Sequence, residues 1–279
     1  MRKVVVVFLA LALAGCAVHP SETGNPDVGT PSVSSSSASI PASTPASSES
    51  PAETVVPETP EVPAEPAVDC SVDKCVALTI DDGPVKQTAE VLDLFKKYDV
   101  KATFFVLGQN AKKYPELLKR MVEEGHEIGN HSWNHPQFDN MTAAQINKQL
   151  DDTDKVIEKA TGIKPVLVRT PYGQGMLDSE KRVRQVLKKR GNPLILWSID
   201  PNDWKASTSA TASCIVGGAR KGSIILTHDT GAETRAAYPT IIKKLQKKGF
   251  KFVTISQMLG DNLKAGKRYS GKGSTDCNR

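Results

Sequence analysis

Short, mostly apolar runs alternate with amphipathic stretches between about residues 75 and 260 of this chain. Runs of four to six residues are typical of strands that are buried on both faces of a sheet. We therefore expect seven strands, at 76–80, 102–107, 127–130, 166–169, 194–199, 223–227 and 250–255.

Apolar positions at helical spacing lie between these runs, at 89–95, 114–122, 146–157, 183–187 and 241–245. Three of the stretches are followed by Gly125, Gly191 or Gly249, and glycine often ends a helix. Strands that alternate with helices indicate a parallel sheet. Seven such units within about two hundred residues favour a closed sheet. We predict an α/β fold, a distorted (β/α) barrel of about seven parallel strands.

The start of the chain has the pattern of an export signal. Arg2 and Lys3 precede an apolar run at 4–14, which is too short to span a bilayer. The run ends in LAGC at Cys16, which resembles a bacterial lipobox, in which the cysteine is lipid-modified and becomes the new N-terminus. The alternative is an ordinary signal peptide cut near Ala17. A lipid on Cys16 would hold the protein at the outer face of the cell membrane, within reach of the wall.

Composition divides the rest of the chain. Residues 17–68 are dominated by Pro, Ser, Thr, Ala, Glu and Val and have no apolar period. Such a segment cannot build a core, so we predict a disordered linker there. The predicted organisation is a lipoprotein signal at 1–16, this linker, a catalytic domain at 69–262 and a basic, flexible tail at 263–279.

Charge is also divided unevenly. The net charge is +5 for the whole chain but +11 for residues 70–279, which hold 34 of the 36 basic and 23 of the 31 acidic residues. Only 5% of residues are aromatic and no basic-aromatic stripe occurs, so we expect no nucleic-acid partner. The charge indicates at most affinity for an anionic wall or membrane. A solvated lysine-rich surface is the favoured interpretation.

Four cysteines remain if Cys16 is lipidated: Cys70, Cys75, Cys214 and Cys277. An even number in an exported chain predicts one or two disulfides, and four cysteines allow three pairings, among which the sequence does not choose. A bridge through Cys277 that ties the two ends of the domain together is one option. The spacing does not fit a metal site, so we assign these cysteines structural roles.

Polar residues gather at the carboxyl ends of five of the expected strands. The clusters are TIDDGP at 79–84, HSWNH at 131–135, RTPYG at 169–173, DPNDW at 200–204 and ILTHD at 225–229. A parallel barrel brings such ends to one face, where these folds place catalytic groups. The convergence of five clusters is stronger evidence for a catalytic site than any one of them. Each alone has an ordinary explanation as a turn, a surface pair, a loop or a helix cap.

Two of the clusters suggest a metal site. Asp82 offers a carboxylate, and His131 and His135 offer imidazoles four residues apart, which we expect on one face of a helical turn. This set suits a divalent metal with open positions, most naturally zinc, with cobalt or nickel as alternatives. The neighbouring Asp81 is left to act as a base. We therefore predict an enzyme.

In this order, the five clusters resemble the motifs of NodB-type polysaccharide deacetylases, carbohydrate esterase family four, over about residues 75–260. Ile80 stands where that family more often has an aromatic residue. The resemblance implies hydrolysis of N-acetyl groups on a sugar polymer. We expect the substrate to be N-acetylglucosamine of peptidoglycan and the enzyme to be a monomer. The alternatives are an O-acetyl xylan or chitin-type deacetylase of the same fold, and an inactive glycan-binding lipoprotein.

The resemblance also implies roles for the residues around the metal. Asp81 would be the general base, oriented by Arg169, and would take a proton from the metal-activated water. His228 would be the general acid, and Asp203 would raise its pKa. The backbone N–H of Tyr172 would stabilise the oxyanion.

Three side chains are expected to bind the substrate. The resemblance implies that Trp204 and Leu226 form an apolar wall that receives the acetyl methyl group, and that Tyr172 also contacts the substrate.

Overall fold

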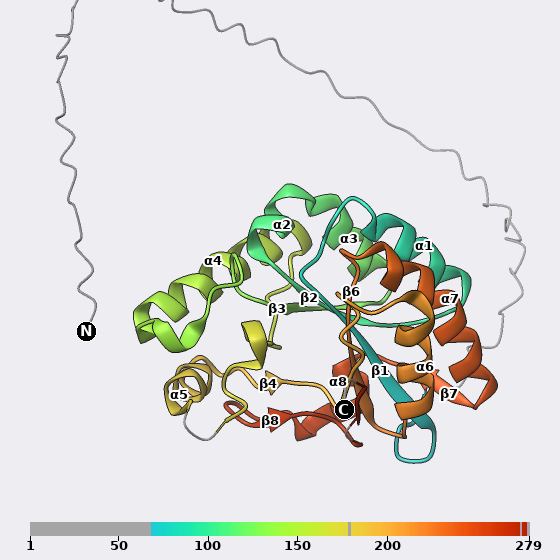
Figure 1. Ribbon diagram of the computed structural model, residues 1–279. Coiled ribbons are helices and arrows are strands. Elements are labelled where there is room, and N and C mark those ends of the chain that lie inside the picture. The colour runs from blue at the N-terminus through green and yellow to red at the C-terminus, as the bar shows by residue number, and fades with distance from the viewer. Residues whose placement is uncertain (1–67, 178–179, 274, 278–279) are drawn as a thin grey trace, which may run out of the picture. The chain divides into compact units, whose positions relative to one another are not determined.

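The computed structural model describes residues 68–177, 180–273 and 275–277 (Figure 1), and all of them belong to the unit Pro63–Arg279. The predicted signal at 1–16, with Cys16, and nearly all of the predicted linker lie outside the described residues. None of the helices in the described part of the chain has the length and hydropathy needed to cross a membrane.

Parallel strands form the centre of the domain. Seven of them make one sheet in the order β3-β2-β1-β6-β5-β9, with β7 also paired to β1, and β4 pairs with β8 in a second, two-stranded sheet. The strands are β1 (Lys74–Asp81), β2 (Thr103–Val106), β3 (Glu127–Asn130), β4 (Leu194–Ile195), β5 (Ile199–Asp200), β6 (Ser223–His228), β7 (Phe250–Phe252), β8 (Arg268–Tyr269) and β9 (Thr275–Asp276). Single bridges from Val168 to Asn130 and to Leu194 connect β3 with β4. The expected distorted barrel is therefore confirmed.

Helices lie on the outside of the strands in Figure 1. They are α1 (Thr88–Lys97), α2 (Gly108–Lys113), α3 (Pro115–Glu123), α4 (Ala143–Thr161), α5 (Lys181–Arg190), α6 (Thr208–Gly218), α7 (Ala232–Lys247) and α8 (Ile255–Leu259). Helix α4 begins at a capping box between Thr142 and Gln145. Helices α4 and α5 end at Gly162 and Gly191, which have φ of 74° and 85°, a conformation that glycine adopts without strain.

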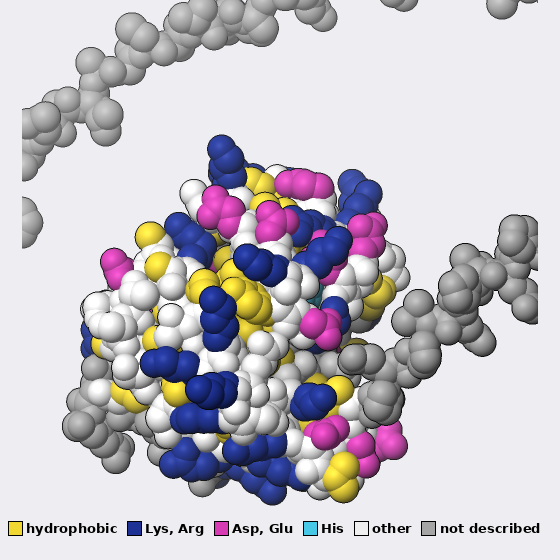
Figure 2. Space-filling model, turned by 90° about the vertical axis from the view of Figure 1, so that its right-hand side faces the viewer, with side chains coloured by type: hydrophobic (Ala, Val, Ile, Leu, Met, Phe, Trp, Pro, Cys, Tyr) yellow, Lys and Arg dark blue, Asp and Glu magenta, His cyan; other side chains and the backbone are white. Residues whose placement is uncertain are grey.

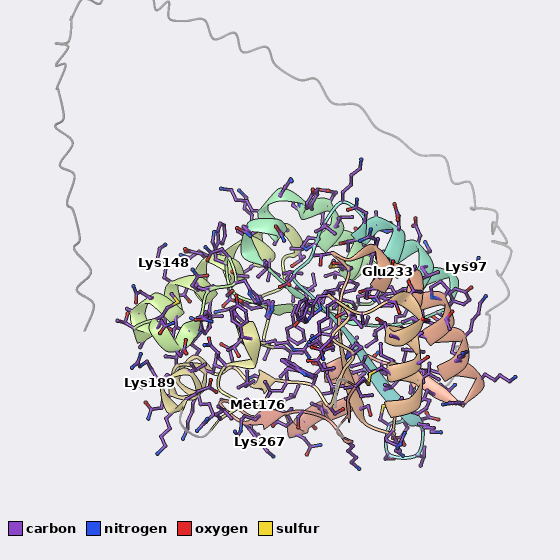
Figure 3. All side chains as sticks on the ribbon, viewed as in Figure 1. Lys97, Lys148, Met176, Lys189, Glu233 and Lys267 are labelled. Carbon is purple, nitrogen blue, oxygen red and sulfur yellow. A yellow bond between two sulfur atoms is a disulfide. The ribbon has the colours of Figure 1, made fainter. Side chains whose placement is uncertain are left out.

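Alternation along β1 separates the helix-facing core from the barrel interior. Val76, Leu78 and Ile80 belong to the cluster that includes the buried residues of α1 and α7. The residues between them point the other way, because side chains alternate along a strand. Ala77 accordingly packs in the interior cluster, and Asp81 has its side chain on the same face. Figure 3 shows that side chains fill the space that the strands enclose.

Three of the expected strands differ from those observed. The run at 166–169 forms only the bridges of Val168, and the run at 250–255 ends early because Thr254 caps α8. The run at 194–199 splits into β4 and β5, since its backbone changes partner. The N–H of Leu196 donates to the carbonyl of Tyr269, whereas the N–H of Ser198 donates to that of Ile224. An apolar run cannot reveal such a change of partner.

The helices α2, α6 and α8 were not expected from the sequence. Helix α6, TSATASCIVGG, is rich in small residues, so its apolar positions show no clear helical period. Helices α2 and α8 have six and five residues, which is too short for the pattern to repeat.

The carboxyl-terminal segment and the cysteines also differ from expectation. Within 263–279, which we predicted as a flexible tail, the structure has β8 and β9. Two disulfides form, Cys70–Cys75 and Cys214–Cys277. Their number agrees with the prediction. Cys277 is tied to α6 and not to the start of the domain, so the proposed link between the two ends is wrong.

The aromatic core between α1 and the sheet yields a stability prediction. Phe95 is fully buried, with its ring centroid 6.2 Å from that of Phe104 and 5.4 Å from that of Tyr238. Phe95→Ala should lower the free energy of unfolding in urea by about 3–5 kcal/mol, through lost burial and the cavity that remains. Val72→Ala, at a side chain that is 77% exposed, should change it by less than about 0.5 kcal/mol. Equal effects of the two substitutions would show that this core is wrongly assigned.

Candidate active site

Residues from all five polar clusters line one cavity of about 460 Å³ at the carboxyl ends of the strands. Its lining consists of Asp81, Asp82, His131, His135, Thr170, Tyr172, Gly173, Trp197, Asp200, Trp204, Leu226, His228 and Thr230. Two further residues singled out from the sequence, Arg169 and Asp203, are buried and contact this lining through Asp81 and His228. The structure thus brings together every catalytic, substrate-binding and metal-binding residue expected from the sequence.

Asp82, His131 and His135, called here the ligand trio, converge at the edge of the cavity. Asp82 Oδ1 lies 3.5 Å from His131 Nε2 and 3.7 Å from His135 Nε2, and the three candidate ligand atoms lie within 4.8 Å of one another. The expected helical turn is wrong, because residues 131–135 form a loop in which Ser132 and His135 have φ of 72° and 61°. The loop brings the two imidazoles together without a helical backbone.

Side chains outside the motif hold this loop in place. Asn130 Oδ1 accepts a hydrogen bond from the backbone N–H of Ser132, and Ser132 Oγ accepts one from that of His135. Gln149 Oε1, on α4, accepts from the backbone N–H of Trp133. These bonds satisfy backbone donors of the loop, and they fix where the imidazoles lie. Sequence reasoning missed Asn130 and Gln149, because an amide on a strand or helix carries no distinctive pattern.

The protonation of His131 suits a metal ligand. Its Nδ1 lies 2.7 Å from the carbonyl oxygen of Arg169, which can only accept, so Nδ1 carries the hydrogen and Nε2 presents its lone pair toward Asp82. Burial lowers the pKa of His131 to about 3, which keeps the ring neutral. Among the described residues, buried Asp82 Oδ1 has no hydrogen-bond partner. Two imidazoles, of which His131 is neutral, and an unpaired carboxylate oxygen fit a divalent cation.

Arg169 holds Asp81 beside the ligand trio. The guanidinium is fully buried, and its Nη1 lies 2.7 Å from both Asp81 Oδ1 and Thr79 Oγ1. Its Nε and Nη2 donate to the carbonyls of Ile195 and Leu196. Burial raises the pKa of the Asp81 carboxyl, and the charge of Arg169 opposes that increase. Asp81 is therefore fixed in position while remaining able to accept a proton.

His228 lies next to Asp81 in the sheet, because the two residues are register partners in the β1–β6 pairing. Asp203 Oδ1 lies 2.8 Å from His228 Nδ1, while Asp203 Oδ2 accepts from the His228 backbone N–H and from the hydroxyl of Thr234. Burial lowers the pKa of His228, but the hydrogen bond and charge of Asp203, with the charges of Asp81 and Asp82, outweigh it and raise the pKa to about 9. His228 is thus protonated at neutral pH.

Aromatic and apolar residues form the rest of the cavity wall. Trp204 and Tyr172 are 69% and 63% exposed, whereas Leu226 is buried. Tyr172 has a positive φ of 57° in a short 3₁₀ turn, Pro171–Gly173, and its ring centroid lies 4.5 Å from that of His135. The hydrogen bonds of the described residues include none from the Tyr172 backbone N–H. That donor is therefore available beside the ligand trio.

Comparison with known proteins gives the family. The family model for polysaccharide deacetylase matches residues 69–195. Peptidoglycan-N-acetylglucosamine deacetylase PgdA of Listeria monocytogenes is 40% identical over 215 residues, which are 76% of this chain and 44% of PgdA. A Bacillus cereus protein named peptidoglycan-N-acetylglucosamine deacetylase is 37% identical over 194 residues, 67% of this chain and 89% of that protein. This chain belongs to the polysaccharide deacetylase family.

A solved structure supports the family over the whole fold. The structure described as T48 deacetylase with substrate is 41% identical, with a TM-score of 0.68, and the match covers 73% of this chain and 100% of that one. This polysaccharide deacetylase family member nevertheless spans less than half the length of PgdA.

Thr88 and Asp229 support the turn that carries Asp82, and sequence reasoning gave them no role. Asp229 is fully buried, and its Oδ2 accepts from the hydroxyl of Thr88, which itself accepts from the backbone N–H of Val85. A Cβ on Gly83 would lie 3.1 Å from Asp229 Oδ1, so glycine allows this close approach. Trp197 was also missed, although it lines the cavity and lies against the Arg169 guanidinium.

The ligand trio predicts metal affinity. His135→Ala should weaken zinc binding by more than about 100-fold, measured by competition with a chromogenic chelator, because loss of a ligand costs more than loss of an outer-shell partner. Lys148→Ala alters an exposed side chain of α4 and should leave affinity within about threefold. Wild-type zinc affinity in the His135 variant would remove His135 from the site.

The Asp203–His228 pair predicts a pH dependence. A general acid must be protonated, so kcat/KM should fall as the pH rises through the His228 pKa of about 9. Asp203→Asn removes the charge that raises this pKa, and the alkaline limb should move to about pH 6.5 or lower. Glu233→Gln, at an exposed carboxylate labelled in Figure 3, should leave the limb in place. If kcat/KM of the Asp203 variant fell at the same alkaline pH as that of the parent, the group that titrates there would not be His228.

Proposed function

We propose that this protein removes N-acetyl groups from N-acetylglucosamine residues of peptidoglycan with the help of a divalent metal. The observation that carries the proposal is the ligand trio, which shares one cavity with Asp81 and His228. PgdA and the Bacillus cereus relative, whose names give this substrate, support the choice of peptidoglycan.

The reaction begins with the attack of water on the acetyl carbonyl carbon. Asp81 acts as the general base and accepts the proton that this water loses, since Arg169 fixes its carboxylate at the cavity. Asp82, His131 and His135 would hold a divalent cation, which would supply Lewis-acid chemistry at the water and the carbonyl oxygen. The backbone N–H of Tyr172 donates to the oxyanion that develops on the carbonyl oxygen.

The C–N bond then breaks, and the nitrogen must gain a proton to leave as an amine. His228 provides it from Nε2, because its Nδ1 is held by Asp203. The products are acetate and a free amine on the sugar. Trp204, Leu226 and Tyr172 bind the substrate, with the first two forming the apolar wall against the acetyl methyl group.

We infer zinc as the native metal, because neutral imidazole and carboxylate ligands suit it at an open site. Cobalt or nickel binds the same set of donors. Metal analysis of protein purified without chelators identifies the ion.

The location of the enzyme follows from the segments that precede the domain. The signal at 1–16 directs export, and lipid on Cys16 anchors the protein, acting as a monomer, to the outer face of the bacterial cell membrane. The linker at 17–68 spans from there to the catalytic domain at 69–262, so that the domain reaches the wall glycan.

The experiment measures acetate release from peptidoglycan, chitin oligosaccharides and acetylated xylan, with mass spectrometry of the muramidase-digested peptidoglycan. We expect loss of acetyl from N-acetylglucosamine. His228→Ala should lower kcat on the amide by about 10²–10⁴-fold and lower it much less on the ester, because an alcohol leaves without full protonation. Unchanged zinc affinity and unfolding temperature in this variant exclude a general structural defect.

The other outcomes separate the rival functions. Acetate from xylan or chitin but not from peptidoglycan would favour a deacetylase of different specificity. Binding of glycan without acetate release by the zinc-loaded protein would favour an inactive glycan-binding lipoprotein. Loss of acetyl from muramic acid alone would move the reaction to the other sugar of the same polymer.

A further inference from the structure

The two ends of the barrel differ in their charged side chains. At the carboxyl ends of the strands, Asp81, Asp82 and Asp200 share the cavity with His131, His135 and His228. At the amino ends lies a group of basic side chains, here called the base surface: Lys74, Arg220, Lys221, Lys247, Lys248, Lys251 and Lys272. Strand β1 runs from one end to the other, and its eight residues span about 25 Å.

Contacts show that the base surface is continuous on one side of β1. Lys74 Nζ donates to the carbonyl of Lys248, and Lys248 Nζ donates to that of Val216, near the end of α6. Lys251 pairs with Cys75 in the β1–β7 ladder. Lys and Arg side chains gather along the lower edge of the molecule in Figure 2, which shows the side formed by α6 and α7.

The base surface continues on the other side of the same strand. The backbone N–H of Gly222 donates to the carbonyl of Cys75, and that of Lys272 donates to the carbonyl of Gly222. Lys221 Nζ donates to the carbonyl of Ser71. A Cβ on Gly222 would lie 3.4 Å from the Lys272 side chain, so that side chain covers the turn.

The base surface has more basic than acidic side chains, and Asp69 and Asp73, beside Lys74 and Lys221, offset only part of its charge. Within the part of the chain that the structure describes, none of its seven basic side chains forms an ion pair with Asp or Glu. The bonds of Lys74, Lys248, Arg220 and Lys221 go to carbonyls, several of them at the ends of α6 and α7. Their charges are therefore available to an anionic partner.

An exposed apolar side chain lies within this basic region. Val72 is 77% exposed, in the loop that the Cys70–Cys75 disulfide closes. Lys221 holds the backbone of the same loop through Ser71. Asp69 and Asp73 lie in the same turn, with Lys74 and Lys221 beside them. An exposed apolar side chain next to lysines matches the boundary between phosphate headgroups and acyl chains. The described chain begins at Val68, beside the same loop.

We propose that the base surface docks on the anionic phospholipid headgroups of the membrane and thereby directs the active-site cavity away from the bilayer. The lysines contact lipid phosphates while Val72 enters the headgroup region. The orientation presents the catalytic groups to the wall, whichever glycan they act on.

The test uses the full chain with Cys16→Ser, which removes the lipid, and measures co-sedimentation with vesicles. The protein should bind vesicles that contain phosphatidylglycerol, bind pure phosphatidylcholine weakly, and dissociate at high salt. The triple variant K247Q/K251Q/K272Q should reduce the partition coefficient by about 100-fold, at about fivefold per charge. Val72→Ser should cause a smaller loss, which stays the same over the range of low salt concentrations at which the parent chain still binds.

A matched variant controls for net charge. K112Q/K119Q/K189Q removes three exposed lysines from α2, α3 and α5, and Lys189 is labelled in Figure 3. It should bind vesicles within about threefold of the parent chain. An equal loss in both triple variants, absence of binding to anionic vesicles, or binding only to a soluble glycerol-phosphate polymer would overturn the proposal.

Catalysis supplies a separate reading. Both triple variants should release acetate from a soluble substrate at the parent rate, because these lysines are remote from the cavity lining. If the parent chain bound anionic vesicles but released no acetate, the result would contradict the proposed reaction and leave the docking surface standing. Acetate release by a parent chain that does not bind anionic vesicles would contradict only the docking surface.

Discussion

One buried guanidinium holds the site together. Arg169 is fully enclosed, and its charge would be costly there without the carboxylate of Asp81 and the oxygens around it. The same residue accepts from His131 through its backbone carbonyl, which sets the tautomer of that imidazole. The position of the proposed base and the lone pair of a proposed metal ligand thus depend on a single residue. The Phe105 ring packs against the guanidinium, with its centroid 4.2 Å from Arg169 Cζ.

The parallel sheet supplies the remaining geometry. Asp81 and His228 are register partners at the ends of β1 and β6, so the proposed base and acid are neighbours before any loop is considered. Their environments then separate their behaviour. Asp81 faces the cationic guanidinium of Arg169, whereas His228 faces the anionic carboxylate of Asp203. Each neighbour favours the charged form of its partner. A paired carboxylate and a paired imidazolium can therefore coexist in one small cavity.

Much of this site could be predicted because its chemistry lies at the ends of strands. The predicted bounds of β1, β2, β3 and β6 agree with the structure within two residues at each end. The polar clusters that follow β1, β3 and β6 meet in one cavity. Prediction failed where a tertiary contact decides the structure. The loop at 131–135 depends on Asn130 and Gln149, and the run at 194–199 breaks where its backbone changes partner. Neither contact leaves a local periodic signal.

X-ray diffraction from zinc-loaded crystals, measured above and below the zinc absorption edge, locates the metal. We expect one strong anomalous peak, bonded to Asp82 Oδ1 and to Nε2 of His131 and of His135, and facing Asp81. A peak held by other side chains, or a fully zinc-loaded protein without a peak between these three atoms, would show that the ligand trio does not bind the metal.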